Sequence, residues 1–149
     1  EIFYGYLMLC ANSFQPAMGY LYRALALQQS DPLLCLLCGV ASLGRSTNRQ
    51  VDNRNHTIIQ GMALFTHYAE LRGDIPEVDY NFARAYHHLN LVHLAVPRYE
   101  RVLQRASSKA SKGTFDMARE AAFNLAMIFT QTGSPDLARH LYRTWLAVE

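Results

Sequence analysis

The chain has 149 residues, the size of one domain, and is long enough to bury roughly 70% of its unfolded surface without disulfides or metals. Half of the residues are hydrophobic and 17% are charged, which excludes an intrinsically disordered chain. The net charge of +2 is too small to indicate nucleic-acid binding by itself. The longest apolar run, residues 32–43, is about half the ~20 residues that a membrane-spanning helix needs, so we expect no membrane contact. Helix-like sequence at both ends indicates a fragment of a longer chain.

Hydrophobic spacing and capping residues predict eight helices and no strand. The expected ranges are about 2–12, 16–29, 32–43, 53–72, 76–90, 93–107, 116–131 and 135–148. Three helix starts combine a capping position with a following proline: Asp31-Pro32, Ile75-Pro76 and Ser134-Pro135. Pro97 falls inside the sixth range, where we expect a late start or a slight kink.

One spacing of small and bulky residues recurs four times along these helices. Its first small position is filled by Gly5, Gly39, Ala83 and Ala126. The steps between them are 34, 44 and 43 residues, which indicates a 34-residue period with insertions of ten and nine residues. Both insertions are polar, at residues 44–55 and 107–114, and are expected to be loops. A 34-residue helix-turn-helix is typical of the tetratricopeptide repeat (TPR), in which small residues let two helices approach closely.

The sequence therefore predicts an all-α fold, a TPR superhelix (α-solenoid) of about eight helices in four repeats with two loop insertions. The repeats, at about 1–31, 32–75, 76–115 and 116–149, are expected to form a single array. The helix at 32–43 is apolar almost all round, which predicts burial on both of its faces. In a TPR array the first helix of each repeat lines a concave groove that receives a peptide or a partner helix.

The groove positions of the third and fourth repeats carry aromatic, amide, cationic and thioether side chains. The candidate binding residues are Tyr80, Asn81, Arg84, His87, His88, Phe123, Asn124 and Met127. This mixture is typical of a protein-binding surface. The alternative, that Tyr80 and Phe123 merely pack against the neighbouring repeat, stays open. A chaperone-type clamp for a C-terminal carboxylate is not expected, because of its residues only Asn81 is in place and the required cations are missing.

Two cysteines, Cys35 and Cys38, have the spacing of a redox pair or of half a zinc site. No strand precedes them and no further pair of ligands completes a zinc site. They occupy repeat positions that a TPR buries between its helices. We therefore expect the cysteines, Cys10 included, to be buried reduced thiols and predict no metal site.

Three histidines, His87, His88 and His93, cluster near Arg84 and Asp79 and suggest a general base or a metal ligand. Adjacent residues on a helix point ~100° apart, however, and no nucleophile or Glu-x-x-His pattern completes a site. The sequence thus predicts no catalytic residue and no cofactor, and indicates that the chain is not an enzyme.

Basic residues gather in the two expected loops. They are Arg45, Arg49 and Arg54 in the first, and Arg105, Lys109 and Lys112 in and before the second. Such groups bind phosphates, but loops of this length are usually solvated, so DNA contact is expected only indirectly or weakly.

Some stretches are more specific than the general TPR pattern: Asp52-Asn53-Arg54-Asn55, Tyr80-Asn81-x2-Arg84-x2-His87, and Glu120-Ala121-Ala122-Phe123-Asn124-Leu125. Over most of residues 1–149 the chain resembles the C-terminal repeats of the TPR subunit of transcription factor IIIC, which serves RNA polymerase III. Ala83 and Asn90 stand where that family often has glycine.

The resemblance implies a nuclear protein-interaction scaffold. In that family the subunit docks sister subunits of the transcription factor and helps to recruit the initiation factor at tRNA-type promoters, without catalysis. The alternative, from the residues alone, is a TPR module that binds a peptide or helix in another multi-subunit complex.

Overall fold

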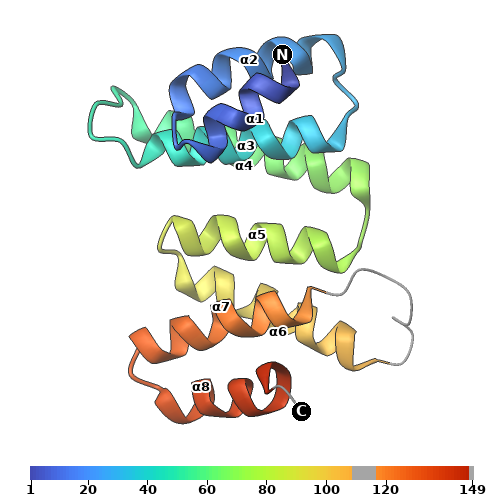
Figure 1. Cartoon of the computed structure of the whole chain (residues 1–149), viewed down its shortest axis with the longest axis vertical. Coiled ribbons are helices and arrows are strands. Elements are labelled where there is room, and N and C mark those ends of the chain that lie inside the picture. The colour runs from blue at the N-terminus through green and yellow to red at the C-terminus, as the bar shows by residue number, and fades with distance from the viewer. Residues whose placement is uncertain (109–116, 148–149) are drawn as a thin grey trace. The chain divides into compact units, whose positions relative to one another are not determined.

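The computed structural model describes residues 1–108 and 117–147, which contain eight α-helices and no strand (Figure 1). The predicted all-α fold is confirmed. The chain divides into two compact units, Glu1–Gly73 and Asp74–Glu149. No helix among the described residues is both long and apolar enough to cross a membrane.

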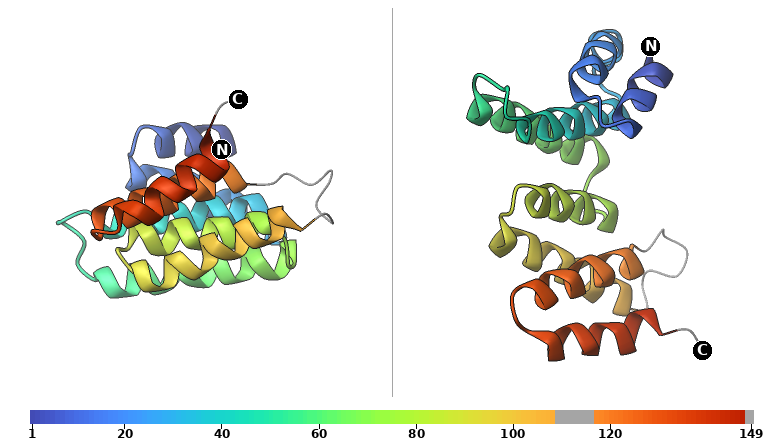
Figure 2. Two further views of the ribbon diagram at one scale, coloured as in Figure 1. Left: turned by 90° about the horizontal axis from the view of Figure 1, so that it is seen from below. Right: turned by 60° about the vertical axis from the view of Figure 1, so that its left-hand side comes forward.

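Four helices form the first unit, and each packs against the next (Figure 2): α1 (Ile2–Cys10), α2 (Phe14–Leu27), α3 (Pro32–Ser46) and α4 (Arg54–Arg72). The start of α3 follows from its capping residue, because Asp31 Oδ1 accepts a hydrogen bond from the Leu33 amide at 2.8 Å. Asn53 caps α4 in the same way and accepts from the His56 amide at 2.9 Å.

Helices α3 and α4 approach each other closely at two glycines. A Cβ atom added to Gly39 would lie 3.3 Å from the carbonyl oxygen of Gly61, and one added to Gly61 would lie 3.3 Å from that of Gly39. Any side chain at either position would push the helices apart. These two residues therefore have the role that the repeat pattern assigns to its small positions.

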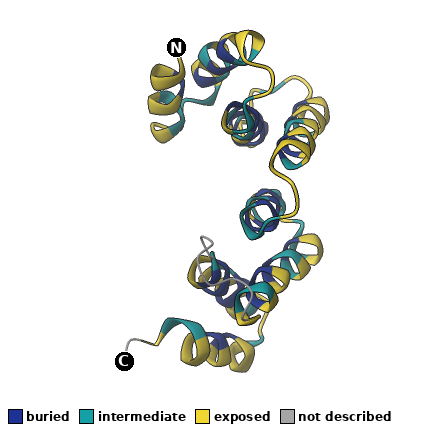
Figure 3. Cartoon of the chain, turned by 90° about the vertical axis from the view of Figure 1, so that its right-hand side faces the viewer, coloured by how far each residue is buried: buried dark blue, intermediate teal, exposed yellow. Residues whose placement is uncertain are grey.

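The second unit consists of α5 (Pro76–His88), α6 (Val92–Ser107), α7 (Ala118–Gln131), α8 (Pro135–Leu141) and a π-helical turn, η2 (Tyr142–Leu146). Its core contains fully buried alanines from each helix pair, such as Ala83 on α5 and Ala95 on α6. Figure 3 shows that helices of the chain are buried along one side and exposed along the other. This is the burial pattern expected of amphipathic helices that pack in layers.

The structure corrects the expected loop at residues 44–55. Helix α3 continues through Gly44 to Ser46, so the connection to α4 is shorter than expected. Gly44 does not end the helix, and the ring of Phe14 fills the space beside it that a larger side chain would need. Helix α2 also starts earlier than expected, at Phe14; Pro16 is then in its first turn, where no amide donor is needed.

Two further predictions concern the ends of helices in the second unit. The expected late start of α6 is wrong, since this helix begins at Val92 and contains Pro97. The expected loop at residues 107–114 overlaps the end of α6 at Ser107, and Lys109, Lys112 and Gly113 lie outside the described residues.

The cysteines are free thiols, and two of them follow the prediction. Cys35 and Cys38 are fully buried on α3, whereas Cys10 is exposed. The prediction for Cys10 is wrong because α1 packs against the rest of its unit on one side only. Burial raises the pKa of Cys38 to about 12, with a smaller contribution from Cys35.

Candidate functional site

Five side chains from three helices of the second unit line a hollow of about 290 Å³. Helix α5 supplies Arg84, His87 and His88, whose spacing of three and four residues places them on one side of the helix. Helix α6 contributes Tyr99, and α7 contributes Asn124. We call this the Tyr99 hollow.

Tyr99 forms the buried base of the hollow. The residue is 0% exposed, and its ring meets those of Tyr80 and His87 edge to face, with centroids 6.1 and 6.3 Å away. Asn124 lies beside both tyrosine hydroxyls, and its Nδ2 donates to the Tyr80 hydroxyl at 3.3 Å. The Tyr99 hydroxyl is buried and makes no hydrogen bond of normal geometry. Burial raises the pKa of Tyr99, so this group remains an O–H donor at neutral pH.

The charge in the Tyr99 hollow comes mainly from Arg84. Its guanidinium is exposed and makes no ion pair with any described residue. Burial lowers the pKa of His87 below its ordinary 6.5, and the nearby Arg84 and His88 lower it further. His87 is therefore neutral at pH 7, and none of the described carboxylates lines the hollow.

A second hollow, of about 320 Å³, adjoins the first at Asn124. We call it the Phe123 hollow; it is lined by Tyr80, Arg119, Glu120, Phe123, Asn124 and Leu146. Phe123 is 49% exposed, a large apolar side chain open to solvent beside a polar site. Together the two hollows make a continuous surface over α5, α7 and the end of η2.

The structure brings six of the eight candidate binding residues to this surface. Met127 and Asn81 line neither hollow; Met127 is exposed on α7 and Asn81 is half-buried on α5. Tyr80 is buried and hydrogen-bonded to Asn124 of the next helix pair, as the packing alternative would have it, whereas Phe123 is exposed. Sequence reasoning missed Tyr99. Its only signal is the hydroxyl group, since the repeat pattern at this position requires a bulky side chain but no polar atom.

Asp79 lies near the histidines in the sequence, but in the structure its carboxylate contacts arginines of α6. Its carboxylate is 3% exposed and lies 2.6 Å from Arg98, 3.4 Å from Arg101 and 3.8 Å from Arg105. Arg105 also pairs with Asp74 at 2.5 Å. A signal for this network exists in the sequence, because the three arginines recur at helical spacing along α6. Since Arg105 is engaged by two carboxylates, it is poorly placed to bind phosphate.

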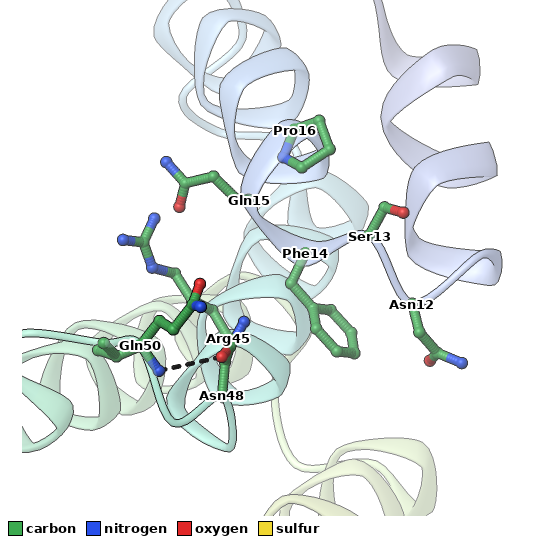
Figure 4. A pocket seen from close by; sticks show the side chains of 9 residues that line it. Asn12, Ser13, Phe14, Gln15, Pro16, Arg45, Asn48 and Gln50 are labelled. Atoms are coloured by element: carbon green, nitrogen blue, oxygen red, sulfur yellow. Dashed lines mark hydrogen bonds between the residues drawn. The ribbon is translucent and has the colours of Figure 1, made fainter.

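The first unit has its own hollow, where the start of α2 meets the end of α3 (Figure 4). Arg45, Asn48 and Gln50 line it on one side, and Asn48 Oδ1 accepts a hydrogen bond from the Gln50 amide at 3.0 Å. Arg45 is half-buried here, whereas Arg49 and Arg54 are exposed. In residues 1–108 and 117–147 no three metal-binding side chains come together.

No protein-family model matches the chain. It is 34% identical to the Schizosaccharomyces pombe transcription factor tau subunit sfc4, 27% to human general transcription factor 3C polypeptide 3 and 30% to the Saccharomyces cerevisiae transcription factor tau 131 kDa subunit. Each match covers 97% of this chain but only 16%, 17% and 14% of the respective relative. All three are subunits of transcription factor IIIC, which confirms the resemblance found in the sequence.

Proposed function

We propose that this chain, which resembles transcription factor IIIC subunits over nearly its whole length, is a protein-interaction scaffold of an RNA polymerase III general transcription factor. It acts in the nucleus, docks sister subunits and helps to recruit the initiation factor at tRNA-type promoters, and it is not an enzyme. The observation that carries the proposal is the match of 97% of the chain to three such subunits.

The surface over the two hollows supports a docking role. Aromatic and arginine side chains contribute most to protein interfaces, because they are large and make several kinds of contact at modest entropic cost. Phe123 and Arg84 are both exposed on this surface and lie on adjacent helix pairs. A partner that covered them would bury an apolar ring and pair a free guanidinium in one contact.

Helix α1 offers a separate apolar surface in the first unit. Phe3, Tyr4 and Tyr6 are more than half exposed on this helix. Exposed aromatic groups of this size mark binding surfaces in soluble proteins. A scaffold that holds more than one subunit needs such separate contacts.

The test replaces Arg84 and Phe123 together by alanine in the full-length subunit and measures its binding to purified sister subunits. We expect loss of binding to at least one of them, with an unchanged helical circular dichroism signal. Tyr80 is left intact because it is buried and its loss would disturb packing. The matched control replaces Leu137 and Arg139, an exposed apolar residue and an exposed arginine on α8, and should bind normally.

Normal binding by the Arg84 and Phe123 variant would exclude this surface as the docking site. If the unmodified protein bound no sister subunit, the scaffold proposal would give way to a TPR module of another complex.

A further inference from the structure

We propose that the Tyr99 hollow receives a side-chain carboxylate of a protein partner, while the adjoining Phe123 hollow takes an apolar side chain next to it. The class of ligand follows from the hollow itself, and only the identity of the partner as a sister subunit rests on the proposed function.

The Tyr99 hydroxyl makes no hydrogen bond of normal geometry. A buried polar group without a hydrogen bond costs roughly 1–3 kcal/mol, so native proteins rarely keep one without a reason. This hydroxyl is buried, and the Tyr99 side chain lines the hollow. As a neutral O–H donor it needs an acceptor, and a carboxylate oxygen is a strong one.

The lining of the Tyr99 hollow carries positive charge from Arg84. Arg84 is an unpaired cation at the hollow, and among residues 1–108 and 117–147 no carboxylate lines the hollow to neutralise that charge. Because His87 is neutral at pH 7, the Arg84 guanidinium is the main positive charge of the hollow. One positive charge balances a singly charged carboxylate better than a phosphate group with nearly two negative charges. The Asn124 side chain adds an amide, whose Nδ2 donates to the Tyr80 hydroxyl and which also interacts with the Tyr99 hydroxyl.

Apolar side chains line the hollow next to this charged one. The exposed ring of Phe123 and the side chain of Leu146 line a hollow that meets the first at Asn124. A partner segment with an acidic residue beside an apolar one would fill both hollows at once. This arrangement differs from the chaperone-type clamp, since it uses Tyr99 from a second helix of the repeat and binds a side chain.

The test titrates the 149-residue chain with N-acetyl-glutamate N-methylamide and follows the His87 and Tyr99 ring signals by NMR. N-acetyl-glutamine N-methylamide is the matched neutral probe. We expect saturable shifts with the glutamate compound. The glutamine compound should bind at least about tenfold more weakly, because it lacks the charge that strengthens the hydrogen bonds. Arg84→Gln and Tyr99→Phe should each weaken glutamate binding by a similar factor.

A second measurement separates binding from folding. Tyr99→Phe removes only a hydroxyl without a partner, so the unfolding midpoint should stay the same or rise. The matched change is Tyr22→Phe, because the Tyr22 hydroxyl is hydrogen-bonded to Ser42 at 2.9 Å. That variant should unfold more easily and yet bind the glutamate compound normally.

Three results would overturn the inference: no saturable shift, equal binding of the two compounds, or undiminished binding by Tyr99→Phe. Tighter binding of inorganic phosphate than of the glutamate compound would also overturn it, in favour of a phosphorylated or nucleic-acid ligand. If glutamate binds but sister subunits do not, the proposed function fails and the carboxylate site stands. If the glutamate compound does not bind, and sister subunits bind even when Arg84 and Tyr99 are replaced, the carboxylate site fails and the proposed function stands.

Discussion

The ring of Phe14 occupies the space beside Gly44 into which any larger side chain would project. Phe14 is the first residue of α2, and Gly44 lies in the last turn of α3. The contact fixes the start of one helix against the end of another. It explains why a residue that usually ends helices is kept inside this one.

Replacing Gly44 by alanine should therefore destabilise the chain, because the new methyl group would overlap the Phe14 ring. We expect a loss of about 1–3 kcal/mol in the free energy of unfolding, measured by urea denaturation. The control is Gly19→Ala on α2, where an added Cβ meets no atom within 4 Å, and which should be neutral or stabilising by up to ~1 kcal/mol. Equal effects of the two changes would show that the Phe14 contact does not constrain position 44.

Replacing Asp79 by asparagine should also destabilise the fold. The change leaves three arginines of α6 without their shared buried carboxylate, and breaking such a pair costs several kcal/mol when both partners are buried. Because Arg98 is 35% exposed, we expect a smaller loss of about 2 kcal/mol, measured as a shift of the denaturation midpoint. Asp136→Asn removes an exposed ion pair with Arg139 and should change the midpoint little; a comparable loss there would contradict the role of burial.

His87 should make stability depend on pH. Its pKa is lowered in the folded chain, so below pH 6.5 the unfolded chain takes up a proton that the folded chain resists. Stability from this group is therefore complete above pH 6.5 and falls as the pH drops towards the folded-state pKa. His87→Gln should flatten the pH dependence of the unfolding midpoint between about pH 7 and 5.

The contribution of Arg84 to the lowered pKa of His87 can be measured separately. Arg84→Gln should raise the pKa of His87, because it removes the nearest positive charge, and an NMR titration of the ring signals measures this. The control, Arg139→Gln on α8, should leave the titration unchanged. A His87 pKa above 6.5 in the unmodified chain would contradict the burial described here.

The cysteines should differ sharply in reactivity towards iodoacetamide at pH 8. Cys10 is exposed, whereas Cys35 and Cys38 are buried, and burial raises the pKa of both thiols. The reagent therefore cannot reach these two cysteines, and they are not in the reactive thiolate form. Mass spectrometry should find one modified cysteine in the native chain and three after unfolding. Rapid labelling of Cys38 in the native chain would mean that α3 opens readily.

Local signals in the sequence were sufficient for most helix boundaries. Asp31 is recognised directly as a cap in the sequence, whereas Asn53, the cap of α4, falls inside the expected helix at 53–72. Gly73 and Gly133 adopt the positive φ angles that end helices. Gly44 could not be interpreted in the same way, because its role depends on a ring thirty residues earlier in the chain. A glycine that permits close packing has the same letter as a glycine that ends a helix.

The candidate site was predictable where groove positions follow the repeat. The helical spacing of Arg84, His87 and His88 indicates a common face, and the structure places all three at one hollow. Tyr99 was not predictable, because its unpartnered hydroxyl is a property of the packed interior. The burial of Tyr80 likewise arises from a contact with Asn124 on another helix pair, which no spacing within α5 reveals.

The π-helical turn at Tyr142–Leu146 directs Leu146 into the Phe123 hollow. A π turn holds one residue more than an α turn, and each residue turns a helix by about 100°. Deleting a single residue from this turn would restore ordinary winding and rotate Leu146 away from Phe123, while leaving the helix itself intact. The apolar wall thus depends on the length of the chain at this point, so an insertion or deletion there would move Leu146 out of the wall without any substitution of a lining residue.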